Sequence, residues 1–359
     1  MFIVDAHQDI AYNTICFNRD YRVSALRKRQ LEANTDVPRQ NGVAVVGLPE
    51  AIAGRVGIVF ATIFTAPDRG NSSVPWADLL YQTPEQAYQM GMRQFDVYQS
   101  LVDADSRLRL IQNEADLDAV LATWEEGAPL TGRQQGLVLL MENADPISEP
   151  AQLAEWHERG LRIVGPAWTG SRYSGGTGMP GPLTADGRDL LDRMAEVNAV
   201  LDLSHIAEQS FYEALDRYDG PIIASHSNPR HFCNTDRHLS DDMIERLAER
   251  DGVMGITMLN YFLDGNWQSS DGKNAVTLNR VVEIADYICQ LTGSAAYVGL
   301  GSDFDGGFGV ESVPAEIDTV ADLWQIKAAL ETRGYTDGDI AAILGGNMAR
   351  KLRQCLATA

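Results

Sequence analysis

Eight short apolar runs spread along the whole chain are the feature that most constrains its fold. Each run is nearly continuous in apolar residues, which is typical of a strand buried on both faces of a parallel sheet, whereas a half-exposed strand would alternate. Longer segments with helical periodicity separate the runs. The predicted strands are Phe2–Ala6, Val56–Phe64, Gly136–Met141, Leu161–Ala167, Ala199–Leu203, Pro221–Ser225, Gly252–Thr257 and Ala296–Gly301.

Several of the intervening segments have clear helix starts. Thr184 precedes one of them, and Ser240 stands before the acidic pair Asp241-Asp242, where negative side chains suit a helix N-terminus. Strands that alternate with helices along the whole chain predict an α/β fold, a (β/α)₈ TIM barrel. The clearest helical segments are Asp189–Asn198, Gln209–Tyr218, Asp241–Arg250 and Leu278–Leu291.

The chain has 359 residues, more than the roughly 250 of a typical barrel, so we expect inserted loops. The surplus falls in Thr65–Trp124 after the second strand and in the glycine-rich Thr169–Gly181 after the fourth, and a helical tail, Thr336–Leu356, would close the barrel. No repeat or linker divides residues 1–359, so we expect one domain. A doubly wound sheet is the competing fold, but it would carry a glycine-rich turn after the first strand, and DAHQDIAYN has no glycine.

The charge balance excludes some partners. Lys and Arg total 29 against 50 Asp and Glu, a net charge of −21, which would repel nucleic acid and anionic membrane surfaces. The four cysteines are widely separated without a CxxC pair, which fits a reducing compartment. The N-terminus MFIVDAHQDIAYN lacks the pattern of a signal peptide, and no apolar run approaches roughly 18 residues. We therefore expect a cytoplasmic protein; barrel hydrolases often pair, so a homodimer is also an expectation.

Metal-binding residue types follow five of the predicted strands, at the end where barrel enzymes place their active sites. Histidine and carboxylate together suit zinc and similar divalent ions, and a carboxylate can bridge two of them. Each residue alone could be a helix cap or a structural histidine, but three of the six histidines occupy equivalent strand ends. The set is His7 and Asp9 after the first strand, Glu142 after the third, His205 after the fifth, His226 after the sixth and Asp303, with Asp305 behind it, after the eighth. Of the remaining histidines, His157 is expected at the surface, and His231 and His238 are weaker site candidates.

Several linked segments carry a resemblance to a known family. They are VDAHQDIAYN, PLTADGRDLLDRM with DLSHIAEQSFYEAL, PIIASHSNPR, RHLSDDMIERLAERDGVMGI, VGLGSDFDGG and ILGGNMARKL. In this order they resemble the membrane (renal) dipeptidase-like zinc metallopeptidases of the amidohydrolase superfamily, over nearly the whole chain. The resemblance implies a (β/α)₈ barrel that hydrolyses dipeptides, often with a D-residue at the C-terminal position.

The resemblance also implies roles for individual residues. His7 and Asp9 would bind one of two divalent ions, expected to be zinc, His205 and His226 the other, and Glu142 would bridge them. The ion pair would generate a hydroxide nucleophile. Asp303 would shuttle the proton to the leaving amine, and Arg237 would clamp the substrate carboxylate through its guanidinium fork.

One position departs from the family pattern. A histidine that helps hold the scissile carbonyl usually ends the fourth strand, and Trp168 stands there in RIVGPAW. The following Gly-rich loop, with Arg172 and Tyr173, could supply a replacement donor, act as a lid or be only a flexible connection. Tyr261, or the neighbouring Asn260, is a further candidate for contact with substrate after the seventh strand.

Because of Trp168, two alternatives to dipeptide hydrolysis remain open. The barrel could hydrolyse N-acyl amino acids, modified dipeptides or lactones, or it could bind a small molecule without catalysis. The complete set of metal ligands argues against the second alternative.

Overall fold

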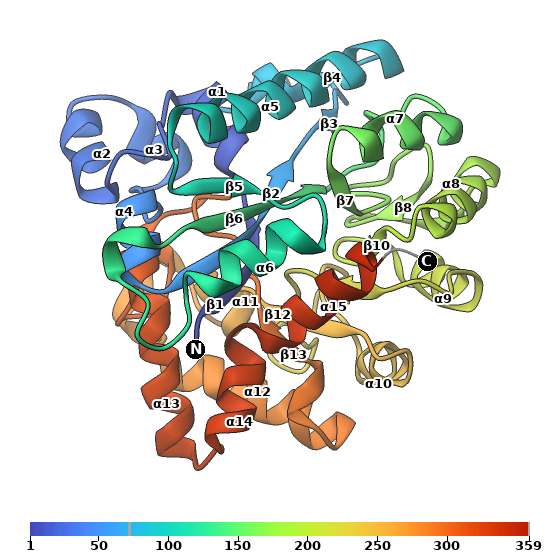
Figure 1. The fold of residues 1–359 in the computed structure, drawn as a ribbon. Coiled ribbons are helices and arrows are strands. Elements are labelled where there is room, and N and C mark those ends of the chain that lie inside the picture. The colour runs from blue at the N-terminus through green and yellow to red at the C-terminus, as the bar shows by residue number, and fades with distance from the viewer. Residues whose placement is uncertain (71–72, 358–359) are drawn as a thin grey trace.

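Eight parallel strands close into a barrel surrounded by helices in the computed structural model, which describes residues 1–70 and 73–357 (Figure 1). Strands pair in the order β2-β1-β13-β12-β11-β10-β7-β6, and β6 pairs again with β2 to complete the ring. The fold is the predicted (β/α)₈ barrel. Its strands are β1 Ile3–Gln8, β2 Val56–Ile63, β6 Gln135–Met141, β7 Leu161–Val164, β10 Val200–Asp202, β11 Ile222–Ala224, β12 Val253–Ile256 and β13 Val298–Leu300.

Each predicted run overlaps one of these strands, but the boundaries differ. The first strand continues through Gln8, so His7 belongs to the strand instead of following it. The last strand covers only Val298–Leu300, because a 3₁₀ turn, Ala295–Tyr297, occupies the beginning of the predicted run.

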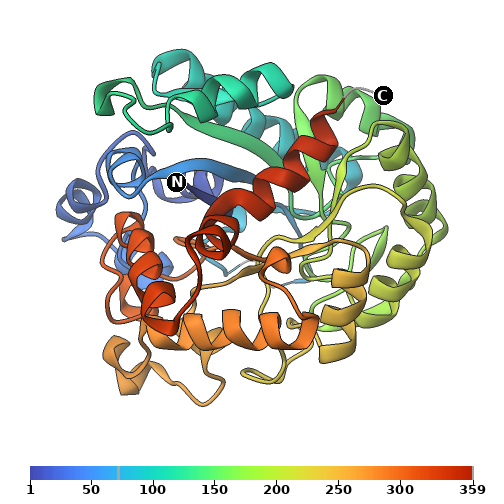
Figure 2. The ribbon, with the colours of Figure 1, turned by 60° about the horizontal axis from the view of Figure 1, so that its bottom comes forward.

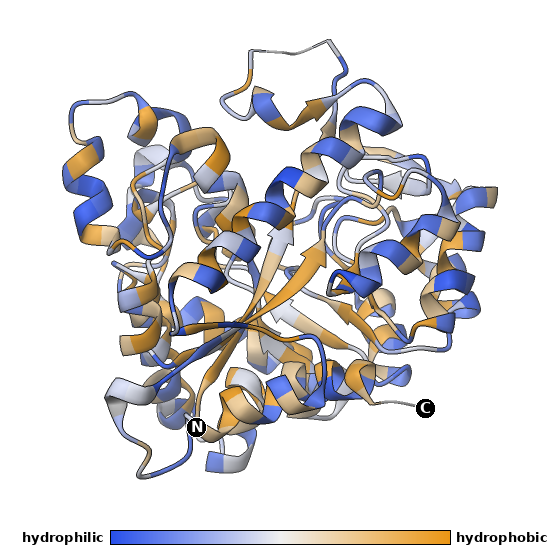
Figure 3. Cartoon of the chain, turned by 45° about the horizontal axis from the view of Figure 1, so that its top comes forward, coloured by the Kyte–Doolittle hydropathy of each residue, from blue (hydrophilic) through white to orange (hydrophobic). Residues whose placement is uncertain are grey.

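The outer helices carry one apolar and one polar face, whereas the barrel strands are apolar (Figure 3). The predicted caps are present: the Thr184 hydroxyl accepts a hydrogen bond from Gly187 N at 3.0 Å, and Ser240 accepts one from Met243 N at 3.3 Å. The helices after the fourth strand are α8 Ala185–Glu196, α9 Glu208–Arg217, α10 Asp241–Glu249, α11 Asn260–Leu263, α12 Leu278–Thr292, α13 Gln325–Arg333, α14 Asp337–Ala341 and α15 Asn347–Leu356. None of the helices within the described residues is both long and apolar enough to cross a bilayer.

Both predicted extensions have structure of their own. The first, whose residues 71–72 lie outside the described part, contains β3 Ala66–Pro67, β4 Leu80–Tyr81, α5 Pro84–Ala104, β5 Leu108–Leu110 and α6 Glu114–Ala122; α7 Leu153–Glu158 follows β6. The glycine-rich segment forms an antiparallel hairpin of β8 Ser174–Gly176 and β9 Met179–Leu183. A third extension was not predicted and lies between β1 and β2. It consists of α1 Ile10–Phe17, α2 Ala25–Glu32, α3 Val37–Asn41 and α4 Leu48–Ala53.

The C-terminal tail closes one end of the barrel, as predicted. Helix α15 lies across the end where the strands begin (Figure 2) and contacts β1, β10, β12 and β13. Its Met348 and Leu352 are fully buried in the same cluster as the inward-facing Val4 and Phe60. The end of the barrel opposite α15 therefore remains free for the polar residues that follow the strands.

Candidate metal centre and active-site cavity

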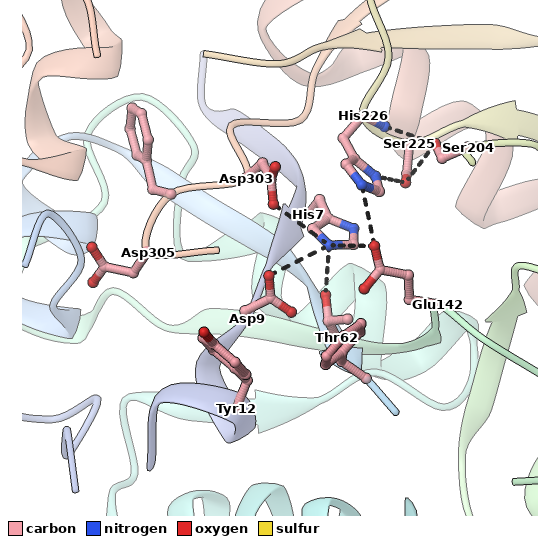
Figure 4. Close-up of polar contacts among 12 residues, drawn as sticks. His7, Asp9, Tyr12, Thr62, Glu142, Ser204, Ser225, His226, Asp303 and Asp305 are labelled. Carbon is pink, nitrogen blue, oxygen red and sulfur yellow. Dashed lines mark hydrogen bonds and ion pairs between the residues drawn. The ribbon is translucent and has the colours of Figure 1, made fainter. Parts of the chain in front are cut away.

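The six predicted metal-site and catalytic residues meet at the carboxyl ends of the strands. His7 Nε2 lies 3.8 Å from Asp9 Oδ2, 3.8 Å from Glu142 Oε1 and 3.9 Å from Asp303 Oδ1 (Figure 4). His7 and Asp9 come from β1 and the residue just after it, Glu142 follows β6, and Asp303 follows β13. Three carboxylates therefore surround one imidazole nitrogen.

Glu142 also faces the two histidines on the other side of the barrel. Its Oε1 lies 3.2 Å from His205 Nε2 and 3.4 Å from His226 Nε2, and these two nitrogens are 3.1 Å apart. Donor atoms of His7, Asp9 and Glu142 lie within 4.8 Å of one another, as do those of Glu142, His205 and His226. Glu142 is thus the carboxylate that both groups share.

A buried carboxylate fixes the orientation of His226. Ser225 Oγ donates to Asp202 Oδ2 at 2.6 Å and lies 2.8 Å from His226 Nδ1. Because the only hydroxyl proton of Ser225 goes to Asp202, His226 Nδ1–H must be the donor in the second contact. The lone pair of His226 is therefore on Nε2, which faces Glu142.

The glycine-rich hairpin orients the ring of His205 in the same way, with Nδ1 turned toward a hydroxyl group. Thr177, between β8 and β9, places its Oγ1 3.0 Å from His205 Nδ1 and donates to the carbonyl oxygen of His205 at 3.4 Å. His205 Nδ1–H can then donate to Thr177, which leaves the lone pair on Nε2. His205 has a φ of 63° and Asp303 a φ of 60°, the left-handed region that residues other than glycine rarely adopt. Such strain concentrates at functional sites.

Two buried carboxylates join neighbouring strands just before the site. Asp202 on β10 accepts from the backbone nitrogen of Ser225 at 2.8 Å as well as from its hydroxyl. Asp5 on β1 accepts from Ser302 N at 2.7 Å and from Ser302 Oγ at 2.6 Å, beyond the end of β13. We call these two pairs the Asp–Ser clasps. They fix the strand ends from which His7, His205, His226 and Asp303 extend.

The chemistry of this donor set fits divalent metal ions. Burial, and next the charge of Asp9, raise the pKa of Glu142 and of Asp303 well above the usual range, and burial with the charge of Asp305 raises the pKa of Asp9 to about 7. Burial lowers the pKa of His7 to about 3, so its imidazole is neutral. His7 Nδ1 and Asp9 Oδ1 are buried without a hydrogen-bond partner. Facing carboxylates and imidazole lone pairs repel one another until a cation lies between them.

A cavity of about 440 Å³ opens beside these residues, within the usual size range of small-molecule sites. Asp9, Glu142, His205 and Asp303 line its polar part. Arg237 is the only lysine or arginine among the lining residues. The remaining lining is Tyr12, Phe64, Trp76, Trp168, Thr169, Thr177, Thr235, Asp236, Leu259, Phe262, Gly306, Gly307 and Phe308.

Comparison with known families agrees with this geometry. The profile of the membrane dipeptidase family, peptidase family M19, matches residues 1–359. The chain belongs to this family. The family hydrolyses dipeptides with the help of metal, and so the chain is a metal-dependent dipeptidase. Family membership does not favour the hydrolysis of N-acyl amino acids or lactones, nor a barrel without catalysis.

Relatives and solved structures are consistent with that assignment. An uncharacterised protein in the pqqA 5′ region of Klebsiella pneumoniae is 30% identical over 71% of this chain and 92% of that protein. Dipeptidase tcpJ of Claviceps purpurea is 25% identical over 88% of this chain and 71% of its own length. A Rhodobacter sphaeroides metallopeptidase liganded with a phosphinate mimic of L-Ala-D-Ala shares the fold with a TM-score of 0.77, at 22% identity and 99% coverage of both chains. The probable dipeptidase PvdM of Pseudomonas aeruginosa also shares it, with a TM-score of 0.79 at 18% identity, over 99% of this chain and 96% of that one.

The structure of the dipeptidase places the predicted substrate contacts differently. Trp168 and Arg237 line the cavity, but Tyr261 does not, and it is 40% exposed. Tyr261 lies outside the cavity because α11 begins at Asn260, and a helix turns successive side chains by about 100°. The neighbouring Phe262 is therefore the residue that lines the cavity.

Three other candidate residues, Asp305, His231 and His238, lie outside the cavity. Asp305 points away from the cluster (Figure 4) and accepts from Val45 N at 2.8 Å and Val46 N at 3.2 Å. His238 is buried, with Nδ1 accepting from Asn228 N at 3.3 Å, whereas His231 is exposed and stacks on Tyr287. None of the three residues therefore faces the space where a substrate would bind.

The glycine-rich segment is more than a flexible connection. Tyr173 is fully buried and its hydroxyl donates to the carbonyl of Ile147, while Arg172 lies 3.5 Å from Asp145. These two residues therefore anchor the hairpin on the barrel and leave Thr177 to contact His205. No motif in the sequence marked Thr177, since its role depends on how the hairpin folds back.

Proposed function

We propose that this dipeptidase uses two zinc ions, one held by His7 and Asp9 and the other by His205 and His226, with Glu142 shared between them. The observation that supports this proposal is the position of Glu142 Oε1, 3.8 Å from His7 Nε2 and 3.2 Å from His205 Nε2. When bound, the ions supply an activated water at neutral pH and polarise the scissile carbonyl. The nitrogen and oxygen donors also suit manganese, and elemental analysis of the purified protein distinguishes the two metals.

Asp303 is proposed as the acid/base residue. Its carboxylate lies beside His7 and lines the cavity, so it faces both the ligands and the space where a dipeptide would bind. There it can accept the proton of the attacking water and deliver it to the amide nitrogen, which leaves as an amine. The cleaved peptide bond thus yields one carboxylate and one amine.

Arg237 is proposed to bind the C-terminal carboxylate of the substrate. Its Nη1 donates to Ser227 Oγ at 3.0 Å and its Nη2 to the carbonyl of His226 at 2.5 Å, which fixes the guanidinium against β11. Nε–H is buried without a partner. With bound metal ions offsetting the charge of the neighbouring carboxylates, this fixed cation with a free donor would bind the anionic end of a dipeptide and orient the amide toward Glu142.

The metal content of purified protein and the D303N substitution test this function together. We expect about two metal ions per chain, loss of activity with a chelator and recovery with zinc. D303N should keep both ions and lose about 10²- to 10⁴-fold in kcat, whereas D216N, at an exposed position of α9, should change neither. If no transition metal can be loaded, the metal mechanism is wrong. If D303N keeps the full rate, Asp303 has no role in proton transfer.

Three further expectations remain predictions from the sequence. They are a single domain over residues 1–359, a cytoplasmic location and a homodimer. Size-exclusion chromatography with light scattering tests the homodimer, and limited proteolysis tests the single domain.

A further inference from the structure

Four aromatic side chains gather on one side of the cavity: Tyr12, Phe64, Trp76 and Trp168. We call them the aromatic box. The ring centroids of Phe64 and Trp168 are 5.0 Å apart, those of Phe64 and Trp76 5.7 Å, and those of Trp76 and Trp168 5.5 Å, with interplanar angles of 75° to 88°. Tyr12 meets Phe64 in the same edge-to-face manner at 6.0 Å. Edge-to-face contacts of this kind hold the rings in a fixed arrangement.

The order of the strands places the aromatic box across the barrel from Arg237. Phe64 follows β2 and Arg237 lies in the loop after β11, and these strands are four steps apart in either direction around the ring of eight. Tyr12 and Trp168 follow β1 and β7, on either side of the β2–β6 pair. The cavity thus has a cationic side and an aromatic side, with Glu142 and the other metal-ligand candidates in the same rim.

The aromatic box offers apolar surface with little polar character. Tyr12 and Phe64 are buried and form its base, and the Tyr12 hydroxyl is occupied as donor to Asn41 Oδ1 at 2.8 Å. Trp76 and Trp168 are half-buried, so part of each indole ring borders the cavity. An apolar group that covers these rings would remove their surface from water, which is favourable.

We propose that the aromatic box binds the side chain of the N-terminal residue of the dipeptide and that the enzyme therefore prefers a large apolar or aromatic residue at that position. This inference rests on the proposed function, because Arg237 then holds the C-terminal carboxylate and Glu142 marks the scissile amide. The N-terminal residue must extend from the amide away from Arg237, and the aromatic box lies in that direction. Phe262, whose ring lies 5.8 Å from the Arg237 guanidinium, and Leu259, which also lines the cavity, remain for the C-terminal side chain.

The position of Trp168 gains a physical explanation from this proposal. A histidine at the end of β7 would offer the substrate a polar ring, whereas the indole of Trp168 completes the three-ring corner with Phe64 and Trp76. Trp168 is also 6.2 Å from the ring of His205, so it forms the boundary between the aromatic box and the metal-ligand residues. The residue thus selects the substrate side chain directly beside the reacting bond.

The test compares dipeptides that share a C-terminal alanine and differ in the N-terminal residue: Phe, Leu, Lys and Ala. With the metal-loaded enzyme, we expect kcat/KM for the Phe and Leu substrates to exceed that for the Ala substrate by about 10- to 100-fold. W76A and W168A should each reduce this ratio by about 10-fold, with most of the change in the Phe and Leu substrates. Y261A removes an exposed aromatic ring outside the cavity and should leave the ratio unchanged.

A binding measurement provides a second readout that does not depend on turnover. Phosphinate mimics of Phe-Ala and Ala-Ala are titrated into wild type, W76A and W168A by calorimetry, and only wild type should strongly prefer the Phe mimic. Equal kcat/KM for all four substrates, or a preference that survives both tryptophan substitutions, would overturn the inference. So would a preference for Lys that is lost in W168A, since the box would then bind a cation. Absence of hydrolysis of every dipeptide by metal-loaded enzyme would instead refute the proposed function.

Discussion

Ser225 offers a sharp test of how the barrel prepares its metal ligands. The substitution S225A removes the hydroxyl that donates to Asp202 Oδ2 at 2.6 Å and accepts from His226 Nδ1 at 2.8 Å. Both partners are buried, and neither can reach water in its place. The backbone nitrogen of residue 225 still donates to Asp202 Oδ1, so the strand pairing of β10 and β11 persists.

The expected magnitudes follow from these contacts. A buried polar group without its partner costs about 1–3 kcal/mol, so two such groups should lower the free energy of unfolding of the metal-free protein by about 2–6 kcal/mol. Loss of a hydrogen bond that orients a ligating histidine lowers metal affinity by about 10- to 100-fold. Because a factor of ten is about 1.4 kcal/mol, zinc binding should weaken by about 1.4–2.8 kcal/mol.

The assay combines urea unfolding of the metal-free protein with zinc competition against a chromophoric chelator. S302A is the matched control, because Ser302 Oγ makes the same 2.6 Å bond to Asp5 but contacts no histidine ring. Asp5 Oδ2 keeps Gln8 Nε2 at 2.7 Å, whereas Phe304 N loses its 3.2 Å bond to Ser302 Oγ, so S302A should lose a comparable amount of stability but bind zinc with nearly unchanged affinity. Equal zinc affinity in wild type and S225A would show that the clasp does not orient His226.

Two further predictions concern stability away from the cavity. M348A should lower the free energy of unfolding by about 2–5 kcal/mol in urea, because it leaves a cavity in the apolar barrel interior, with kcat unchanged. Burial lowers the pKa of Lys28 to about 8, so the folded protein binds fewer protons than the unfolded chain between pH 8 and 10.5, and stability should rise by about 3 kcal/mol across that window. K28M should abolish the rise; a rise of the same size in both proteins would contradict this explanation.

The barrel and its ligand set could be predicted because they produce two different sequence patterns. Buried strands appear as apolar runs, and the metal-ligand candidates appear as histidine or acidic residues where these runs end. Each strand is buried on both faces and mostly apolar, and His205 and His226 come just after such runs. A histidine or an acidic residue at the end of an apolar run is easy to recognise in the sequence. Glu142 follows the same rule, since MEN interrupts the apolar run that forms β6.

The helices between β1 and β2 could not be predicted because burial there does not follow an apolar pattern. In α2, the buried side chains include Lys28 and Glu32, so the hydrophobic period that would mark an amphipathic helix is missing. Glu32 is buried because Arg19 pairs with it through two hydrogen bonds of 2.9 Å each. Only the folded chain brings Arg19 and Glu32 together, and the same holds for Thr177 and His205.

The Asp–Ser clasps have a consequence for how the enzyme folds and acquires its metal ions. They contain no metal-ligand candidate, so the strand ends at β1, β10, β11 and β13 are joined by the polypeptide itself. We therefore expect the chain to fold before it binds its ions, and to lose them and take them up again without unfolding. Activity would then change with the concentration of available metal as fast as the ions bind and dissociate, while the barrel stays folded throughout.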